Sequence, residues 1–248
     1  MSGPTTDETD PLPPSGTGAR LEINSPLSSD TVRRLARAAT AHDPTTIVDH
    51  GCGWGAMLLA CLEEAPRARG LGLDVHGPDI VRAGSDAERR GLADRVELRE
   101  ADATGCTDRA DLLISLGAYQ AFGSVPEALV ALRERRAGGG RLLFGCETWA
   151  GTPTADELAH MWDGASTDDC RTLVEVVEDA YAAGWVLLGM HETTRQEFDD
   201  FDLGHLRERQ EWLARHPDHA DADEIAREVT DWLRGHRRPL GFVTLLLG

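Results

Sequence analysis

The chain has 248 residues, of which 41% are apolar and 27% are charged. This length is sufficient for one well-buried α/β domain with additions but is short for two domains. Its formal net charge of -18 comes from 43 acidic and 25 basic residues, and this charge argues against nucleic acids and anionic membranes as partners. The five cysteines are scattered without a C-x-x-C pair, and no segment has the roughly 18 apolar residues of a membrane span, so we expect a cytoplasmic protein.

The chain opens with a compositionally biased segment. Residues 1–20 are rich in Pro, Gly, Ser, Thr and acid, and they lack the basic and apolar regions of a secretion signal. We therefore predict a disordered N-terminal tail over 1–20 and assign residues 21–248 to a single domain. At the start of that domain, Ser29-Asp30 is predicted to cap a helix over 31–39 that closes off the side where a ligand would bind.

Apolar runs of strand length then alternate with helical patterns, which predicts parallel βαβ units and a doubly wound α/β fold. Crossover helices are expected over 79–90 and 125–136, and the glycines at 138–140 are expected to stop the second helix. The predicted strands cover 45–50, 71–75, 95–99, 111–115, 141–147, 184–194 and 241–247.

A long insertion separates the last two predicted strands. It spans residues 196–240 and contains amphipathic segments at 203–216 and 222–235. We interpret it either as a helical lid that binds substrate or as a helical hairpin that only covers the sheet edge. Its acidic beginning, residues 196–202, is either a solvated helix start or a site that selects an amine-bearing acceptor, and it lacks the ligand spacing of a recognised metal loop.

The most informative motif is Val48-Asp49-His50-Gly51-Cys52-Gly53-Trp54-Gly55, a strand that ends in a carboxylate and continues into three alternating glycines. Glycine lets the backbone turn tightly and lets a ligand lie against the main chain, so a nucleotide-like cofactor is expected. The spacing Gly51-x-Gly53-x-x-Ala56 also fits a dinucleotide fingerprint, with Asp74 as its ribose-binding acid. Asp49 would repel a pyrophosphate but attract the ammonium and sulfonium groups of S-adenosylmethionine, which favours the methyl donor.

Together with three later motifs, this stretch resembles the class I S-adenosylmethionine-dependent methyltransferases, in the small-molecule branch that includes ubiquinone-methyltransferase-like and cyclopropane-synthase-like proteins. The resemblance covers about residues 22–248. It implies a Rossmann-like doubly wound seven-stranded sheet of order 3-2-1-4-5-7-6 with an antiparallel last strand. The later motifs are Gly70-Leu71-Gly72-Leu73-Asp74-Val75, Arg99-Glu100-Ala101-Asp102-Ala103 and Asp111-Leu112-Leu113-Ile114-Ser115-Leu116-Gly117-Ala118.

The resemblance also implies a cofactor site. In the family, the acid and glycines of the first motif surround the methionine part of S-adenosylmethionine, which places Asp49 there. Asp74 would accept hydrogen bonds from the ribose hydroxyls, and Asp102 from the adenine amino group. A capping role for Asp102 in the following turn is the alternative. The predicted cofactor-binding residues are Asp49, Gly51, Cys52, Gly53, Trp54, Asp74, Val75, Asp102, Ala103 and Ser115.

The fourth motif bears on the acceptor. Ser115-Leu116-Gly117-Ala118-Tyr119 lacks the Asn/Asp-Pro-Pro-aromatic sequence of enzymes that methylate nucleic-acid bases or glutamine, which indicates a small-molecule acceptor. Gly145-Cys146-Glu147-Thr148-Trp149 resembles a Gly-Glu-x-x-Trp-like segment of some family members, and Gln120 stands where a companion loop often has histidine. A base is needed only if the acceptor loses a proton as it attacks. The catalytic candidates are Glu147, His191 and Tyr119, and the predicted substrate-binding residues are Tyr119, Gln120, Trp149, Phe198 and Phe201.

The predicted function is in-line transfer of a methyl group from S-adenosylmethionine to oxygen, nitrogen, sulfur or a nucleophilic carbon of a small molecule, such as a natural-product intermediate. Two alternatives stay open: a protein that binds S-adenosylmethionine without methylating, and a nicotinamide-dependent oxidoreductase. The candidate residues also have structural interpretations. Glu147 would bind a backbone amide or an arginine, His191 would face outward from its strand, and Tyr119 and Trp149 would be core aromatics. We expect no metal, and the second helix of the insertion could pair two subunits into a homodimer.

Overall fold

The computed structural model describes residues 12–248, so residues 1–11 of the predicted tail lie outside the described part. The fold is built on a seven-stranded sheet of order β3-β2-β1-β4-β5-β7-β6. β7 is antiparallel to both of its neighbours, whereas the other adjacent strands are parallel, so the predicted sheet order and orientation are confirmed. In chain order the strands are β1 (Thr46–His50), β2 (Arg69–Asp74), β3 (Val96–Glu100), β4 (Ala110–Leu116), β5 (Arg136–Trp149), β6 (Leu187–Glu192) and β7 (Leu240–Leu247).

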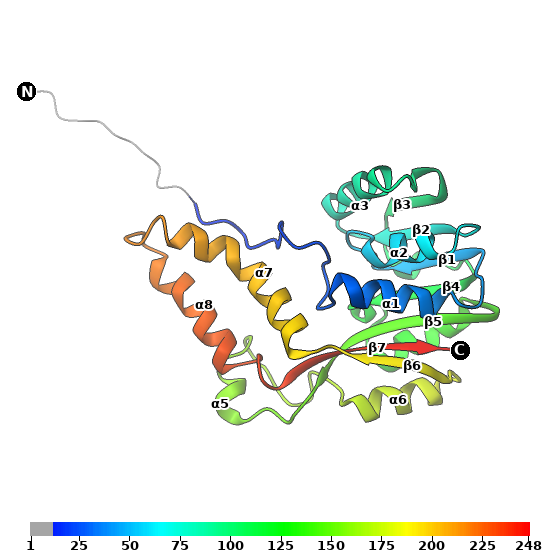
Figure 1. Cartoon of the computed structure of the whole chain (residues 1–248). Helices are drawn as coiled ribbons and strands as arrows, with labels where there is room; N and C mark the ends of the chain where they lie inside the picture. The colour runs from blue at the N-terminus through cyan, green and yellow to red at the C-terminus, as the bar shows by residue number, and fades with distance from the viewer. Residues whose placement is uncertain (1–11) are drawn as a thin grey trace, which may run out of the picture.

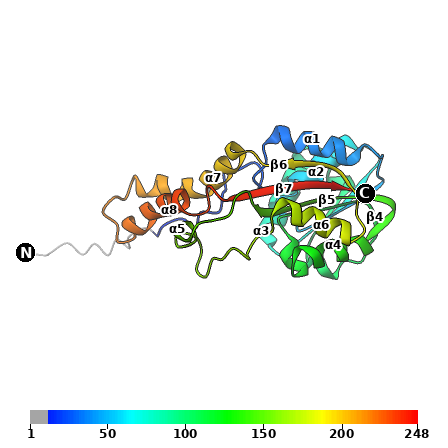
Figure 2. The ribbon, with the colours of Figure 1, turned by 90° about the horizontal axis from the view of Figure 1, so that it is seen from below.

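Helices cover both faces of this sheet (Figure 2). α1 (Ser29–Thr40), α2 (Ala56–Glu64) and the end of α3 (Gly77–Arg89) pack in one apolar cluster with Ile47 and Ile114. On the other face, α4 (Val125–Glu134) and α6 (Leu173–Ala182) form a second cluster with the fully buried Trp185. Two apolar layers on one sheet are expected of a doubly wound α/β fold, whose central strands are buried on both sides.

Three short 3-10 helices also connect these elements. η1 (Ala93–Arg95) precedes β3 at its amino end, whereas η2 (Ala103–Gly105) and η3 (Tyr119–Phe122) lie near the carboxyl ends of strands. η2 follows β3 and η3 follows β4, so the residues predicted to contact adenine and acceptor lie in short, irregular segments. Loops at this edge of an open α/β sheet are where ligands usually bind.

A helical arm projects beyond the end of the sheet (Figure 1). It consists of α7 (Arg195–Leu213) and α8 (Ala222–Arg234), and the short α5 (Ala155–Leu158) lies near its base. α7 begins at Arg195 rather than at the predicted residue 203, because Thr194 and Glu197 form a capping box that starts the helix there. The acidic run 196–202 is therefore the first part of α7, and α8 matches the predicted second helix closely.

The segment before α1 runs along this arm. Arg209 of α7 donates to the carbonyl oxygen of Pro14 at 3.0 Å, Thr17 N donates to Glu208 at 3.2 Å, and Arg20 pairs with Glu211 at 2.7 Å. This segment, part of the tail that the sequence predicts to be disordered over 1–20, thus contacts the second half of α7. Within residues 12–248, no helix is long and apolar enough to cross a membrane.

Two predicted boundaries differ from the structure. The N-cap of α1 is Ser28, whose hydroxyl accepts from Thr31 N, rather than Ser29-Asp30. The glycines at 138–140 do not stop α4, which has already ended at Glu134; they lie inside β5. A Cβ on Gly140 would stand 2.8 and 2.9 Å from the carbonyl oxygens of Asp111 and Ala110, where the pairing of β4 with β5 shifts register. The glycines therefore allow the irregular pairing of β4 with β5.

This packing predicts a difference between two neighbouring glycines. Gly140→Ala should lower the free energy of unfolding by about 1–3 kcal/mol, because the added methyl group meets backbone atoms that cannot move aside. Gly138→Ala is the matched control, since a Cβ there would meet nothing within 4 Å. Urea denaturation of both variants measures the difference, and equal stabilities would contradict the close approach at Gly140.

Candidate active site

The glycine turn after β1 is held against the neighbouring strand. The backbone amides of Gly51 and Cys52 both donate to the carbonyl oxygen of Leu73, at 2.8 and 2.9 Å. Gly51, Gly53 and Gly55 all have positive φ values, of 81°, 49° and 72°, which side chains rarely tolerate. A Cβ on Gly51 would also collide with the Cβ of Ala118 in the loop after β4. The motif is therefore required by backbone conformation and by close packing.

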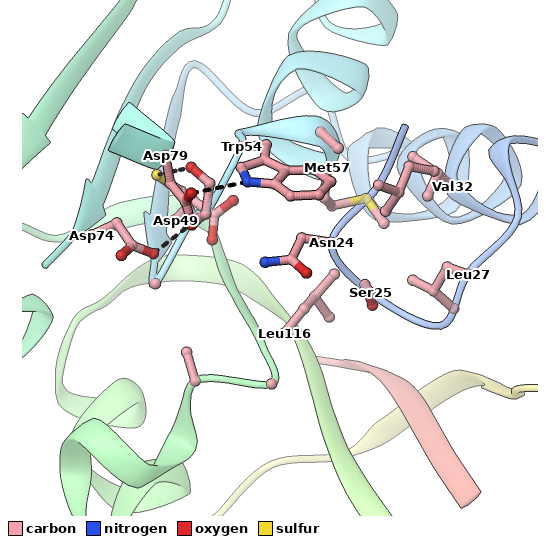
Figure 3. A pocket seen from close by; sticks show the side chains of 17 residues that line it. Asn24, Ser25, Leu27, Val32, Asp49, Trp54, Met57, Asp74, Asp79 and Leu116 are labelled. Atoms are coloured by element: carbon pink, nitrogen blue, oxygen red, sulfur yellow. Dashed lines mark hydrogen bonds between the residues drawn. The ribbon is translucent and has the colours of Figure 1, made fainter. Parts of the chain in front are cut away.

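A cavity of about 190 Å³ opens beside this turn, at the carboxyl ends of β1, β2 and β4 (Figure 3). Six of the predicted cofactor-binding residues line it. They are Asp49, Gly51, Cys52, Gly53, Trp54 and Asp74. The sequence motifs around the first two strands thus meet at one cavity.

Asp74 stands at the end of β2 with its carboxylate directed to the turn. Its Oδ2 accepts from Gly53 N at 2.8 Å, and its Oδ1 accepts from His76 N at 2.9 Å. A carboxylate offers about four acceptor positions, so two backbone amides leave capacity for hydroxyl donors from a ligand. The backbone amides also fix the orientation of this carboxylate.

Asp49 lies deeper in the same cavity and is 3% exposed. Burial raises the pKa of its carboxyl to about 7, and the neighbouring negative charge of Asp74 adds to the shift. Near neutral pH this group is therefore balanced between its protonated and ionised forms. A cation bound beside it would favour the ionised form.

Trp54 forms one wall between the turn and α3. Its indole Nε1 donates to Asp79 Oδ1 at 3.0 Å, and the guanidinium of Arg82 lies 3.5 Å from the centre of its ring. Figure 3 shows Trp54 and Asp79 joined on the same side of the cavity as Asp49. Burial raises the pKa of the Cys52 thiol, so this lining residue is an unreactive thiol rather than a nucleophile.

The remaining predicted cofactor residues are not among those that line the cavity. Val75 is 72% exposed, and Ser115 is fully buried with no hydrogen-bond partner for its hydroxyl within residues 12–248. Asp102 Oδ1 accepts from both N and Oγ1 of Thr104, at 2.8 and 2.7 Å, and these bonds lower its pKa. Asp102 is therefore the cap of η2, as the alternative interpretation expected, and its role toward a ligand stays a prediction, as does that of Ala103.

Glu147, near the carboxyl end of β5, comes close to the cavity. Its Oε1 is 3.9 Å from where a Cβ on Gly117 would stand, and Gly117 lines the cavity. Its Oε2 is buried and has no hydrogen-bond partner in the described part of the chain. Burial raises the pKa of this carboxyl. The backbone amide of Glu147 itself interacts with the carboxyl and opposes part of this shift, while Oε2 stays without a partner within residues 12–248.

Tyr119 and Gln120 lie in η3, directly after β4. Burial raises the pKa of Tyr119 to about 12, and the negative charge of Glu147 adds to the shift, so the phenol stays protonated at neutral pH. Trp149 donates from Nε1 to the carbonyl oxygen of Thr167 at 2.9 Å and stacks on Trp162 with ring centres 6.5 Å apart. Trp149 is thus a core aromatic residue whose indole N–H has a hydrogen-bond partner, and its contact with substrate stays a prediction.

His191 is held between two charged side chains. Arg34 Nη2 lies 3.0 Å from Nδ1, and Glu197 Oε2 lies 3.2 Å from Nε2. Because guanidinium can only donate, Nδ1 accepts and Nε2 carries the proton that it donates to Glu197. Both ring nitrogens are occupied, so this geometry favours a structural role for His191 over that of a free base.

The predicted substrate residues of the arm also lie away from the cavity lining. Phe198 is buried in a small cluster with Trp149, Leu240 and Phe242. Phe201 contacts Phe198 edge to face and packs on the His205 ring, with centres 4.8 Å apart. The acids of this run are also paired: Asp199 with Arg237 at 2.7 Å, and Asp202 with Trp232 Nε1 at 2.7 Å. These pairings favour the structural interpretation of the acidic run.

Sequence reasoning missed several lining residues. The loop before α1 contributes Asn24, Ser25 and Leu27, and Figure 3 shows them on the opposite side of the cavity from Asp74. This loop has no motif or periodicity that could have revealed it. Asp79 was detectable, because it is an acid in the first turn of the helix that follows the ribose-binding strand. Further lining residues outside the prediction are Ile23, Val32, Ala56, Met57, Leu116, Gly117 and Ala118.

Comparisons with known proteins place this fold. No family model matches the chain. It is 26% identical over 209 residues to the uncharacterized protein YjhP of Escherichia coli, covering 84% of each chain. A methyltransferase from Geobacter sulfurreducens, solved in complex with S-adenosylhomocysteine, superposes with a TM-score of 0.82 at 25% identity, covering 94% of this chain and 96% of that one. A Thiobacillus denitrificans methyltransferase, also solved with S-adenosylhomocysteine, gives a TM-score of 0.82 at 22% identity, with the same coverage of both chains.

The chain has the class I S-adenosylmethionine-dependent methyltransferase fold. The resemblance predicted from the four motifs is thereby confirmed. The fold and the similarity to the Geobacter sulfurreducens methyltransferase support an S-adenosylmethionine-dependent methyltransferase enzyme over the nicotinamide-dependent oxidoreductase.

The buried carboxyl of Asp49 predicts a pH dependence of folding. Its pKa is about 7 in the folded protein and near 3.8 in the unfolded chain, so rising pH destabilises the fold between these values. Asp49→Asn removes this effect, and its gain in stability over wild type should grow by roughly 1–3 kcal/mol between pH 5 and pH 8. Thermal denaturation across that range measures the difference, and a gain that is independent of pH would contradict the assignment.

Proposed function

We propose that this protein transfers a methyl group from S-adenosylmethionine to a small-molecule acceptor by in-line displacement. The observation that carries the proposal is the single cavity in which Asp49 and Asp74 face a bare glycine backbone, in a fold shared with methyltransferases. When bound, S-adenosylmethionine would supply an electrophilic methyl group on a positively charged sulfur. The protein's own part is to bind, orient and desolvate the reactants.

The charge of the cavity supports a cationic ligand. Three carboxylates, those of Asp49, Asp74 and Asp79, line it, and within residues 12–248 no arginine does. A pyrophosphate would add negative charge next to these groups, whereas an ammonium or sulfonium would favour the ionised form of Asp49. The cavity therefore suits the methyl donor better than a dinucleotide.

The residues fit the donor in detail. The free acceptor positions of Asp74 suit a pair of ribose hydroxyls, and the turn at Gly51 and Gly53 lets a ligand approach the backbone closely. The cavity of about 190 Å³ is smaller than the roughly 300–1,000 Å³ typical of ligand pockets, so part of the donor would extend outside it. Val75, Asp102 and Ala103, at the ends of β2 and β3, are the proposed contacts of that exposed adenine end.

Glu147 is the proposed base for an acceptor that loses a proton as it attacks. Its carboxyl is close to Gly117, and its unpartnered Oε2 and raised pKa suit it to accept a proton. Tyr119 stays protonated and would donate a hydrogen bond to the acceptor. The proline-free fourth motif supports a small metabolite as the acceptor, and the composition supports a cytoplasmic location. The proposal also includes a homodimer formed through α8.

One observation favours the alternative, a protein that binds S-adenosylmethionine without methylating. His191 is occupied at both ring nitrogens, and Gln120 stands where the family often has histidine, so Glu147 alone is left as a base. Incubation with S-adenosylmethionine and fractionated metabolite extracts separates the two functions. Release of S-adenosylhomocysteine that depends on an added fraction supports the transferase, and binding of the donor without such release supports the alternative.

Loss of the Asp74 carboxylate should weaken donor binding. Asp74→Ala is expected to raise the dissociation constant of S-adenosylhomocysteine by about 10- to 100-fold, because hydrogen bonds to a charged group are worth about 1.5–3 kcal/mol. Asp94→Ala, in η1 at the opposite end of the sheet, is the control and should bind as wild type. Isothermal titration calorimetry provides the constants, and unchanged binding by Asp74→Ala would remove Asp74 from the site.

Glu147→Gln separates the acceptor side from the donor side. The substitution removes a base but keeps the shape of the side chain, so kcat should fall about 10²- to 10⁴-fold. The dissociation constant of S-adenosylhomocysteine should change less than about threefold, because Glu147 is not among the residues that line the cavity. An undiminished rate with an acceptor fraction that wild type methylates would show that Glu147 is not the base.

A further inference from the structure

Glu197, in the first turn of α7, hydrogen-bonds to the starts of two different helices. Its Oε2 accepts from N and Oγ1 of Thr194, at 3.0 and 2.9 Å, which completes the capping box of α7 itself. Its Oε1 accepts from N and Oγ of Ser28, at 3.0 and 2.8 Å, and Ser28 is the N-cap of α1. One carboxylate thus joins elements that lie 169 residues apart in sequence.

The other capping boxes show that this second contact is not needed to start a helix. α4 and α6 begin with the same motif, through Ser124 with Glu127 and Thr172 with Glu175. The hydrogen bonds of Glu127 and Glu175 go to the N-cap residue of their own helix. The bonds from Glu197 to Ser28 are therefore additional to the capping function.

The Glu197 side chain is largely shielded from solvent, and both of its carboxylate oxygens accept hydrogen bonds. The side chain of Glu197 is 9% exposed, and His191 donates to its Oε2 at 3.2 Å while accepting from Arg34 of α1. Burial alone would raise the pKa of Glu197, but hydrogen bonds from Thr31, Ser28 and Thr194 outweigh it and hold the pKa well below its usual range. Glu197 is therefore ionised, and its loss would remove the acceptor that Ser28, Thr194 and His191 share.

Ser28 directly follows the loop that lines the cavity. Asn24, Ser25 and Leu27 of this loop face Asp49 and Trp54 across the cavity in Figure 3. On the other side of the loop, residues 14–20 are bound to α7 through Arg209, Glu208 and Glu211. Figure 1 shows this blue segment passing between the arm and α1. The loop is thus held to α7 at both ends, and Glu197 forms the attachment nearer to the cavity.

We propose that Glu197 is a positioning residue that holds the loop 23–28 closed over the methyl-donor cavity and fixes it to the helical arm. The residue acts through Ser28, and the loop it holds forms the cavity wall. The identity of the bound donor rests on the proposed function, whereas the restraint on the loop does not. Any displacement of α7 would move the loop, so the arm and the closure of the cavity are coupled.

The test compares Glu197→Gln with Glu175→Gln, which removes the equivalent charge from the capping box of α6 far from the cavity loop. The first readout is hydrogen–deuterium exchange of the ligand-free, full-length proteins. Amides of residues 23–32 should exchange about tenfold faster or more in Glu197→Gln, because hydrogen bonds to a charged acceptor are lost. In Glu175→Gln these amides should exchange as in wild type.

The second readout is the affinity for S-adenosylhomocysteine by calorimetry. Its dissociation constant should rise about tenfold in Glu197→Gln and stay unchanged in Glu175→Gln. Faster exchange without weaker binding would overturn the claim that the loop closes the donor cavity, and unchanged exchange would overturn the restraint itself. If the wild-type protein does not bind S-adenosylhomocysteine but exchange in Glu197→Gln changes as expected, the proposed function is refuted. The restraint of the loop by Glu197 is then still supported.

A second pair of variants covers the case in which Glu197→Gln does not fold. Ser28→Ala removes the hydroxyl that donates to Glu197 and the cap of α1, and Ser124→Ala removes an equivalent cap from α4. Both should lose similar stability, since N-caps contribute about 0.5–2 kcal/mol. Only Ser28→Ala should speed exchange at 23–28, and equal exchange in that loop for the two variants would overturn the proposal.

Discussion

The close approach of two turns at the centre of the sheet is the constraint on which the site depends. Gly51, after β1, packs directly on Ala118, after β4, and no side chain fits between them. From β1 the chain continues to β2 on one side, and β4 returns on the other, so the connections diverge at this point. Such a switch point is where open α/β sheets form ligand crevices. The cavity, the amino end of α2 in its lining and the position of Asp49 all follow from this arrangement.

The electrostatics of the cavity point to the charge of its ligand. Asp49 and Asp74 are brought together by adjacent parallel strands, with Asp49 buried and Asp74 held by two backbone amides. Burial of Asp49 next to a second carboxylate is unfavourable without a cation, as its pKa of about 7 indicates. The protein maintains this arrangement because the glycine turn and the two strands fix the backbone. A site of this kind is prepared for positive charge before the ligand arrives.

Much of the fold could be predicted because its signals are local. Strand-length apolar runs located all seven strands, and the glycines with Asp49 and Asp74 identified one side of the cavity. The other side could not be predicted, since Asn24, Ser25 and Leu27 belong to an irregular loop whose position is set by contacts with α7. His191 could not be interpreted from sequence either, because one of its two partners, Arg34, lies 157 residues away in the sequence. The glycines at 138–140 looked like a helix stop, since sequence does not reveal that Gly140 faces the backbone of β4.

The central claim is that the acidic cavity binds the cationic methyl donor, and calorimetric titration of the wild-type protein with S-adenosylmethionine and S-adenosylhomocysteine at pH 6 and pH 8 tests it most directly. The two compounds differ by the methyl group and the charge on sulfur. As Asp49 becomes ionised, the affinity for S-adenosylmethionine should increase relative to that for S-adenosylhomocysteine by about threefold or more. A ratio that does not change with pH, or the absence of binding by either compound, would contradict the account.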